Sequence, residues 1–178
     1  MQTIQIKDKK FTISISESEI QTAVMEVAKK LNNDLWDKNP LFICVLNGAF
    51  MFAADLLRNF TFPCEITFVK YSSYSGLKTT GAIHEHIGLD KCIEGRSVVI
   101  IEDIVDTGLT MKSITEMLKS NGAADVRIAT LLQKPDALEH SIAVDYVALN
   151  IPNDFVVGYG LDYDGQGRNL KEIYTLAE

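Results

Sequence analysis

The sequence has few cysteines, and their arrangement argues against a metal site. Cys44, Cys64 and Cys92 are odd in number and widely spaced, so they lack the paired spacing of metal ligands. Cysteines of this kind act as small apolar side chains in a reducing compartment. We therefore expect a cytoplasmic protein.

Long apolar runs and a surplus of positive charge are also missing. No apolar run reaches the length of a membrane-spanning helix, and the first residues, MQTIQIKDKKF, lack the apolar core of a signal peptide. The 17 Lys and Arg against 24 Asp and Glu give a net charge of −7. This balance argues against nucleic acid or an anionic membrane as the main partner. A small polyanion stays compatible with it, because local dipoles or a metal ion can reverse the sign at one site.

The overall composition is that of an ordinary globular protein. Its 178 residues are 47% hydrophobic and 23% charged, which suffices for one sizeable core. No repeat, low-complexity tract or linker divides it, so we expect a single domain over residues 1–178.

Periodicity predicts strands that alternate with helices. Alternation over residues 3–16 indicates an edge hairpin, and Ser16 with Glu19 forms a capping-box pattern before a helix that should end near Asn39-Pro40. Such an order favours an α/β fold with a mainly parallel sheet flanked by helices, whose ligands bind beyond the carboxyl ends of the strands. Further strands are expected at 41–46, 64–74, 97–102, 126–132 and 144–149, with helices at about 49–60 and 110–122.

The segment VVIIEDIVDTGLTM (98–111) places acids and hydroxyls at the end of the most apolar strand. In DTGLT (106–110), Gly108 would let backbone N–H groups converge beside Thr107 and Thr110 at the start of a helix. Such a turn suits a phosphate monoester. The adjacent Glu102 and Asp103 could accept hydrogen bonds from sugar hydroxyls or organise a hydrated magnesium ion. Together these features predict a phosphorylated ribose as ligand.

A plainer interpretation also fits these residues. The strand could simply end in acids, with Asp106 or Thr107 capping the next helix. The Walker pattern is missing, so a nucleoside triphosphate is not indicated. His84 and His86 alternate on an expected strand without a third ligand, which favours a structural role over a metal pair.

The 98–111 segment resembles the phosphoribosyl-pyrophosphate motif of the type I phosphoribosyltransferases. The resemblance covers most of the chain and is strongest to the hypoxanthine–guanine subfamily. Its other segments occur in the same order: VLNGAFMFAADL (45–56), SSYSGLKTTG (72–81), LLQK (131–134) and FVVGYGLDY with Arg168 (155–168). It implies the type I fold, with a small hood formed from the two termini.

The resemblance also implies a role for each matching residue. Asp106 is the general base near N7 of the purine, while Glu102 and Asp103 bind the ribose hydroxyls and support a magnesium ion. The 5′-phosphate is held by Thr107, Gly108, Leu109 and Thr110, and pyrophosphate by Arg168 and the loop of Leu46, Asn47 and Gly48, where the family often has a cis peptide. Lys134, Phe155 and Val156 recognise the purine, and Asp162 binds a second Mg²⁺. A loop containing Ser73 and Tyr74 closes over the reaction centre.

One residue departs from the family pattern. Family members commonly carry Lys or Arg where this chain has Asn47. The loss of that charge puts part of the pyrophosphate affinity in question, although backbone amides could still bind it.

The resemblance implies a purine-salvage enzyme that converts a 6-oxopurine and phosphoribosyl pyrophosphate into IMP or GMP and pyrophosphate, with Mg²⁺ as cofactor. It further implies a homodimer or homotetramer that binds neither nucleic acid nor membrane. Two alternatives remain: a non-catalytic phosphoribosyl-pyrophosphate sensor, and a transferase for xanthine or a pyrimidine. A sensor of the repressor type would carry a basic DNA-binding extension, which this acidic chain does not show.

Overall fold

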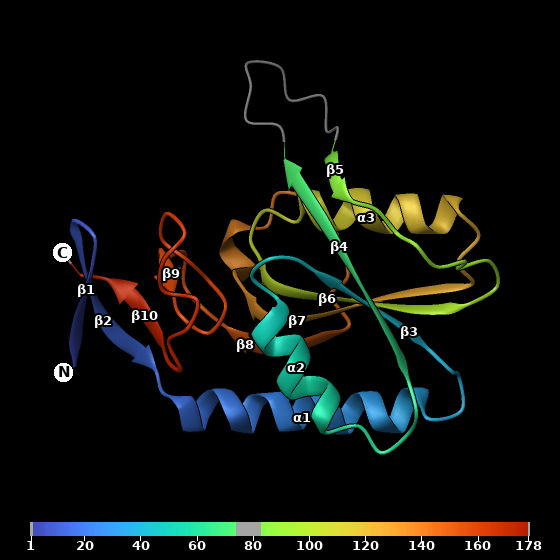
Figure 1. Cartoon of the computed structure of the whole chain (residues 1–178), viewed down its shortest axis with the longest axis horizontal. Coiled ribbons are helices and arrows are strands. Elements are labelled where there is room, and N and C mark those ends of the chain that lie inside the picture. Colours follow the sequence, from blue (N-terminus) through green and yellow to red (C-terminus); the bar gives the residue numbers. More distant parts are fainter. Residues whose placement is uncertain (1, 74–82, 178) are drawn as a thin grey trace.

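The central sheet has six strands in the order β5-β4-β3-β6-β7-β8. The computed structural model describes residues 2–73 and 83–177 (Figure 1). The neighbours β4, β3, β6, β7 and β8 pair in parallel in this order, whereas β5 pairs antiparallel with β4. The strands are β3 (Leu41–Val45), β4 (Glu65–Ser73), β5 (Ile83–Ile87), β6 (Ser97–Val105), β7 (Asp125–Gln133) and β8 (Tyr146–Asn150). The predicted mainly parallel sheet is confirmed.

Helices cover both faces of this sheet (Figure 1). Helices α1 (Glu17–Leu35) and α2 (Phe50–Arg58) lie on one face, and α3 (Leu109–Ser120) lies on the other. Successive side chains of a strand point to opposite faces. In β3, therefore, Phe42 packs in the cluster with α1 and α2, while Ile43 packs in the cluster with α3. This burial on both sides explains why the strand is apolar throughout.

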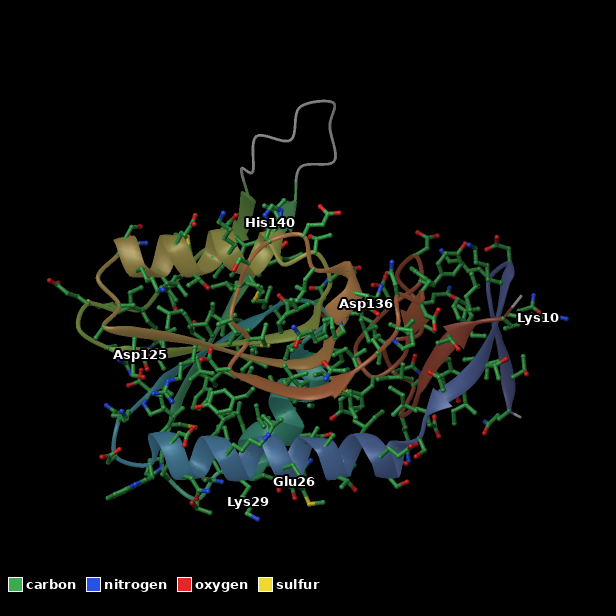
Figure 2. The ribbon with its side chains drawn as sticks, turned by 180° about the vertical axis from the view of Figure 1, so that it is seen from behind. Lys10, Glu26, Lys29, Asp125, Asp136 and His140 are labelled. Carbon is green, nitrogen blue, oxygen red and sulfur yellow. The ribbon has the colours of Figure 1, made fainter. Side chains whose placement is uncertain are left out.

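Helix α1 starts as predicted and ends earlier. Ser16 and Glu19 form both hydrogen bonds of the capping box. The helix ends at Leu35 rather than near Asn39, because the Lys38 N–H bonds the Leu35 carbonyl in a tighter turn and Asn39 adopts a φ of +44°. Figure 2 shows the side chains of Glu26 and Lys29 on the outer side of α1, away from the sheet.

Strand β6 is longer than its apolar run predicts. Its pairing with β3 stops at Ile101, but its pairing with β7 continues through Glu102 to Val105. Glu102 and Asp103 therefore lie within the strand, and Asp106 is the first acid beyond it. The last part of β6 is held from one side only, which leaves its other side open to a ligand.

Both termini build a second, antiparallel sheet, which we call the hood. Its strands lie in the order β1-β2-β10-β9, and its small core includes Phe11, Val157 and Tyr174. Lys10 marks the end of the molecule that this sheet occupies (Figure 2). The strands are β1 (Thr3–Ile6), β2 (Lys9–Ile15), β9 (Val156–Val157) and β10 (Ile173–Leu176). The hood predicted from the resemblance is confirmed.

A single-turn 3₁₀ helix, η1 (Pro135–Ala137), follows β7. Within residues 2–73 and 83–177, no helix combines the length and apolarity needed to cross a membrane.

Candidate functional site

A cavity of about 420 Å³ lies where the carboxyl ends of β3 and β6 meet the segment between β9 and β10. This is the edge at which parallel sheets bind their ligands. Its lining contains most of the residues singled out from the sequence: Leu46, Asn47, Gly48, Glu102, Asp103, Asp106, Thr107, Gly108, Thr110, Asp162 and Arg168. The remaining lining residues are Val45, Tyr71, Ile104 and Met111.

A larger cavity, of about 680 Å³, lies elsewhere. It is bounded by α1, the end of β8 and the hood, and its charged lining residues are Glu19 and Asp154. Glu19 is already engaged in the capping box. Four acids and Arg168 converge in the smaller cavity, so we take that one as the candidate site.

The acids of β6 create a negative potential at the floor of the site. Burial, and then the charge of Asp103, raise the pKa of Glu102 well above its usual range. Burial together with both carboxylates also raises the pKa of Cys44, on the neighbouring strand, to about 12. Asp103 Oδ1 accepts a hydrogen bond from the Ile104 N–H at 2.8 Å. Such a floor favours a ligand that brings hydroxyl donors or a cation.

The turn at residues 106–110, which we call the cradle, leaves the start of α3 without a side-chain cap. The N-cap of α3 is Gly108, with a φ of +84°, so it has no side chain to occupy the N–H groups of the first turn. The Thr107 hydroxyl stands 3.5 Å from the Leu109 N–H, at the limit of a hydrogen bond. The Thr107 carbonyl accepts the N–H groups of Glu139 and His140, which anchors the turn. The N–H groups and dipole of a helix start favour a phosphate here.

An ion pair joins the candidate base to the candidate purine-binding lysine. Lys134 Nζ lies 3.1 Å from Asp106 Oδ2. The lysine side chain is 9% exposed and the aspartate 50%. The Lys134 N–H also bonds the Val105 carbonyl, which fixes the segment after β7 beside the end of β6. Lys134 thus belongs to the site through Asp106, although it does not line the cavity.

The loop between β3 and α2 packs directly on β6. Its Leu46–Asn47 peptide bond is cis, which agrees with the expectation from the resemblance. A Cβ added to Gly48 would overlap the carboxylate of Asp103. A larger residue at this position would therefore displace the Asp103 carboxylate or the loop.

The segment after β9 contributes a charged pair to the opposite wall. Arg168 Nη2 lies 2.6 Å from Asp162 Oδ1, and Arg168 Nη1 donates to the Gly160 carbonyl at 2.7 Å. Asp162 Oδ2 accepts the Gly165 N–H at 2.6 Å. Each carboxylate oxygen keeps a further lone pair, so Asp162 can still contact a cation.

Other predicted residues lie outside this arrangement. Phe155 is 47% exposed and packs its ring near Phe11 and Tyr163 in the hood. Val156 is buried in β9 and lines the larger cavity. Tyr74 and the side chain of Ser73 are outside the described residues, as is most of the predicted loop at 72–81.

Sequence reasoning missed Val45, Tyr71, Ile104 and Met111 as lining residues. Their positions carried a signal: Val45 ends β3, Tyr71 lies near the carboxyl end of β4, and Ile104 lies between two of the acids. Met111 is in the first turn of the helix that follows the cradle. Apolar residues in these places normally indicate core packing, so composition alone did not separate them.

Comparison with known proteins identifies relatives of this arrangement. A family model described as the phosphoribosyl transferase domain matches residues 16–164. A hypoxanthine-guanine phosphoribosyltransferase of Streptococcus thermophilus is 41% identical over 167 residues, 93% of each chain. A crystal structure of a hypoxanthine phosphoribosyltransferase from Staphylococcus aureus has a TM-score of 0.89 at 40% identity, covering 93% of this chain and 91% of that one. A hypoxanthine-guanine phosphoribosyltransferase from Bacillus anthracis has a TM-score of 0.87 at 33% identity, covering 94% and 97%.

The cradle predicts a difference between two glycine substitutions. An alanine at Gly108 (φ +84°) or Gly95 (φ +71°) must adopt a left-handed backbone, which costs roughly 1–2 kcal/mol of stability. At Gly108 the new Cβ would also press on Ile142 at 3.1 Å, whereas at Gly95 nothing lies within 4 Å. Calorimetric titration with ribose 5-phosphate should show at least about tenfold weaker binding for Gly108→Ala and unchanged binding for Gly95→Ala. Equal affinities would show that the cradle does not hold the phosphate.

Proposed function

The chain belongs to the phosphoribosyltransferase family, within its hypoxanthine–guanine subfamily, and we propose that its site transfers the 5-phosphoribosyl group to a 6-oxopurine. The donor is phosphoribosyl pyrophosphate, and the products are a nucleoside monophosphate, IMP or GMP, and pyrophosphate. The protein is therefore a pentosyl-transferring enzyme of purine salvage.

The ion pair between Lys134 and Asp106 is the observation that carries the choice of base. In a 6-oxopurine, N7 and the 6-oxygen are neighbours on one edge of the ring. A lysine only donates hydrogen bonds and an ionised carboxylate only accepts them. Lys134 can donate to the 6-oxygen while Asp106, 3.1 Å away, accepts the proton of N7. Phe155 is 47% exposed, so its ring would be available to stack on the purine, and Val156 would add backbone contacts.

The donor substrate would extend from the cradle across the acidic floor. The first turn of α3, with Thr107, Gly108, Leu109 and Thr110, would hold the 5′-phosphate. Glu102 and Asp103 would then accept hydrogen bonds from the ribose hydroxyls. Leu46, Asn47 and Gly48 with Arg168 would bind the pyrophosphate, because they line the same cavity on the side of the hood segment. Asn47 supplies no charge, so backbone amides and Arg168 would carry that binding.

The acids of the cavity suit magnesium that arrives with the substrate. Within residues 2–73 and 83–177, no group of three or more His, Cys, Asp or Glu side chains could hold a metal alone. Magnesium commonly keeps several waters and takes one or two carboxylates together with substrate phosphates. Asp162, at the pyrophosphate wall, and Glu102 with Asp103, at the ribose floor, fit that pattern. Bound there, magnesium would neutralise the leaving pyrophosphate.

The acids also suit the charge that develops during transfer. The bond from the anomeric carbon to pyrophosphate would break, and a bond from that carbon to N9 of the purine would form in its place. In the transition state, positive charge would develop on the sugar. Asp106 would take the N7 proton and offset that charge, while Lys134 keeps the 6-oxygen oriented. The electron pair of the broken bond leaves with pyrophosphate, whose charge Arg168 helps to balance.

We further propose a cytoplasmic homodimer or homotetramer. The three cysteines are free thiols, as suits a reducing compartment. Large apolar side chains that stand exposed, among them Trp36, Phe50 and Phe68, suit surfaces that a second copy would cover. Light scattering of the purified protein would distinguish these assemblies from a monomer.

The role of Asp106 is tested by a substitution that keeps its shape. Asp106→Asn removes the base, so kcat should fall by about 10²–10⁴-fold while the thermal unfolding curve changes little. Asp136→Asn is the control, because Asp136 is an exposed acid on η1 (Figure 2). Near-parental turnover of the Asp106 variant would remove this residue from the mechanism.

Magnesium dependence follows from the charge of the floor. Glu102, Asp103 and Asp162 would repel a substrate with several phosphates unless a divalent cation lies between them. Turnover should disappear in excess chelator and return when magnesium is restored, whereas chelator already saturated with magnesium should have no effect. Undiminished turnover in free chelator would contradict the proposed cofactor.

A panel of free bases tests the function itself. Adenine carries an amino donor at C6, which would face the buried ammonium of Lys134, so kcat/KM for hypoxanthine should exceed that for adenine by at least about 10³-fold. Guanine should react, and xanthine and the pyrimidines belong in the same panel. Lys134→Ala should lower both the rate and the preference, whereas Lys119→Ala, on the exposed end of α3, should change neither. Use of adenine within tenfold of hypoxanthine would overturn the assignment.

A further inference from the structure

Tyr159 is buried in a backbone conformation that large residues rarely adopt. It stands between Gly158 and Gly160, and the three φ angles are +105°, +48° and +101°. The tyrosine is only 3% exposed. A positive φ in a bulky residue persists only where the surroundings hold it, and such residues concentrate at functional sites.

The Tyr159 hydroxyl is held by a carboxylate on α2. It donates to Asp55 Oδ2 at 2.6 Å, and Gln21 of α1 donates to the same oxygen at 2.8 Å. Burial, followed by the hydrogen bond to Asp55, raises the pKa of Tyr159, so the hydroxyl stays a donor at any physiological pH. This polar cluster, Tyr159–Asp55–Gln21, ties the segment after β9 to the two helices of one face.

Asp55 and Tyr159 are connected to the segments that form the two walls of the pyrophosphate site, the loop that contains Gly48 and the segment that carries Arg168. Asp55 lies on α2, which begins directly after the loop that contains Gly48. On the other side, the Gly160 N–H bonds the Arg168 carbonyl at 3.0 Å, and the Gly160 carbonyl accepts from the Arg168 guanidinium. A Cβ on Gly160 would overlap the Gly48 carbonyl, so the two walls touch beside the tie. Any shift of Tyr159 would therefore move Arg168 relative to the Gly48 loop.

We propose that Tyr159, acting through Asp55, is a positioning residue that sets the spacing of the two pyrophosphate-binding walls. It does not line the cavity, so it acts through Gly160 and Arg168. The inference rests on the proposed function, because it takes pyrophosphate as the ligand of these walls.

The chain offers a matched control in Tyr146. This residue is 4% exposed and donates to Asp34 of α1 at 2.8 Å, so it is also a buried tyrosine bound to a helix carboxylate. Its hydroxyl additionally accepts from Arg127 at 2.8 Å, on β7. None of these three residues lines the candidate site. Tyr146→Phe therefore removes the same group from the same kind of contact without touching either wall.

The first measurement needs no turnover. Calorimetric titration with magnesium pyrophosphate should show at least about tenfold weaker binding for Tyr159→Phe than for the parent, and a change within twofold for Tyr146→Phe. Thermal unfolding should show that both variants remain folded and lose comparable stability. Equal affinity of the two variants would overturn the proposal.

Kinetics and a rescue variant separate positioning from a general loss of structure. In Tyr159→Phe, KM for phosphoribosyl pyrophosphate should rise about tenfold, while KM for hypoxanthine stays within twofold. Asp55→Asn keeps an acceptor oxygen for the tyrosine and should retain the parental pyrophosphate affinity, whereas Asp55→Ala should lose it to the extent that Tyr159→Phe does. The double variant Tyr159→Phe/Asp55→Ala should bind no more weakly than either single variant, because both remove one interaction.

The outcomes distinguish this proposal from the proposed function. A parent that binds magnesium pyrophosphate but transfers no phosphoribosyl group would contradict the function, and the binding series would still decide the role of Tyr159. An active parent with additive losses in the double variant, or with equal KM shifts for both substrates, would overturn the positioning role alone.

Discussion

The site depends on two close contacts made by glycines, where the absence of a side chain lets one segment lie directly against another. Gly48 lies against the carboxylate of Asp103, and Gly160 lies against the carbonyl of Gly48, with no room for a Cβ at either glycine. Three segments that are distant in sequence, β6, the loop after β3 and the segment after β9, are thereby stacked in direct contact. In the proposed function, the phosphate and pyrophosphate groups are highly charged and the ribose between them is neutral, so the residues that bind them must converge within one cavity of about 420 Å³. Side chains between these segments would separate the walls and leave the charged groups too far apart.

The same closeness sets the electrostatics of the site. Burial and the neighbouring Asp103 raise the pKa of Glu102, so the empty floor disfavours two adjacent carboxylate charges. The cations within the protein stand at the edges, where Arg168 is paired with Asp162 and Lys134 with Asp106. Each of these acids is thus kept oriented before substrate binds. In the proposed function, magnesium arriving with the substrate would complete the charge balance without large rearrangement, which is the advantage of a preorganised site.

Local pattern predicted much of this arrangement, and long-range contact explains the rest. The turn at Gly108 and the capping box of α1 each depend on a few consecutive residues, so the sequence predicts both. The end of β6 could not be placed, because its last pairs are made with β7 alone and an acid looks like a terminator in any local window. Tyr159 was missed for a similar reason: between glycines it resembles a turn or core residue, and Asp55 resembles an exposed helix acid. Only the fold brings these two within 2.6 Å.

The arrangement of the hood gives the hydrogen bond between Tyr159 and Asp55 its structural importance. Its four-stranded sheet is separate from the central sheet and packs around a small core of its own, yet the segment between its strands β9 and β10 carries Asp162 and Arg168. Apolar contacts hold two layers together but tolerate small sliding movements, because they have no preferred direction. A hydrogen bond to a carboxylate is short and directional, so it fixes register as well as proximity. Tyr159 bonds Asp55 of α2 at 2.6 Å, and in the proposed role this directional contact sets the distance between the charged groups of the two walls.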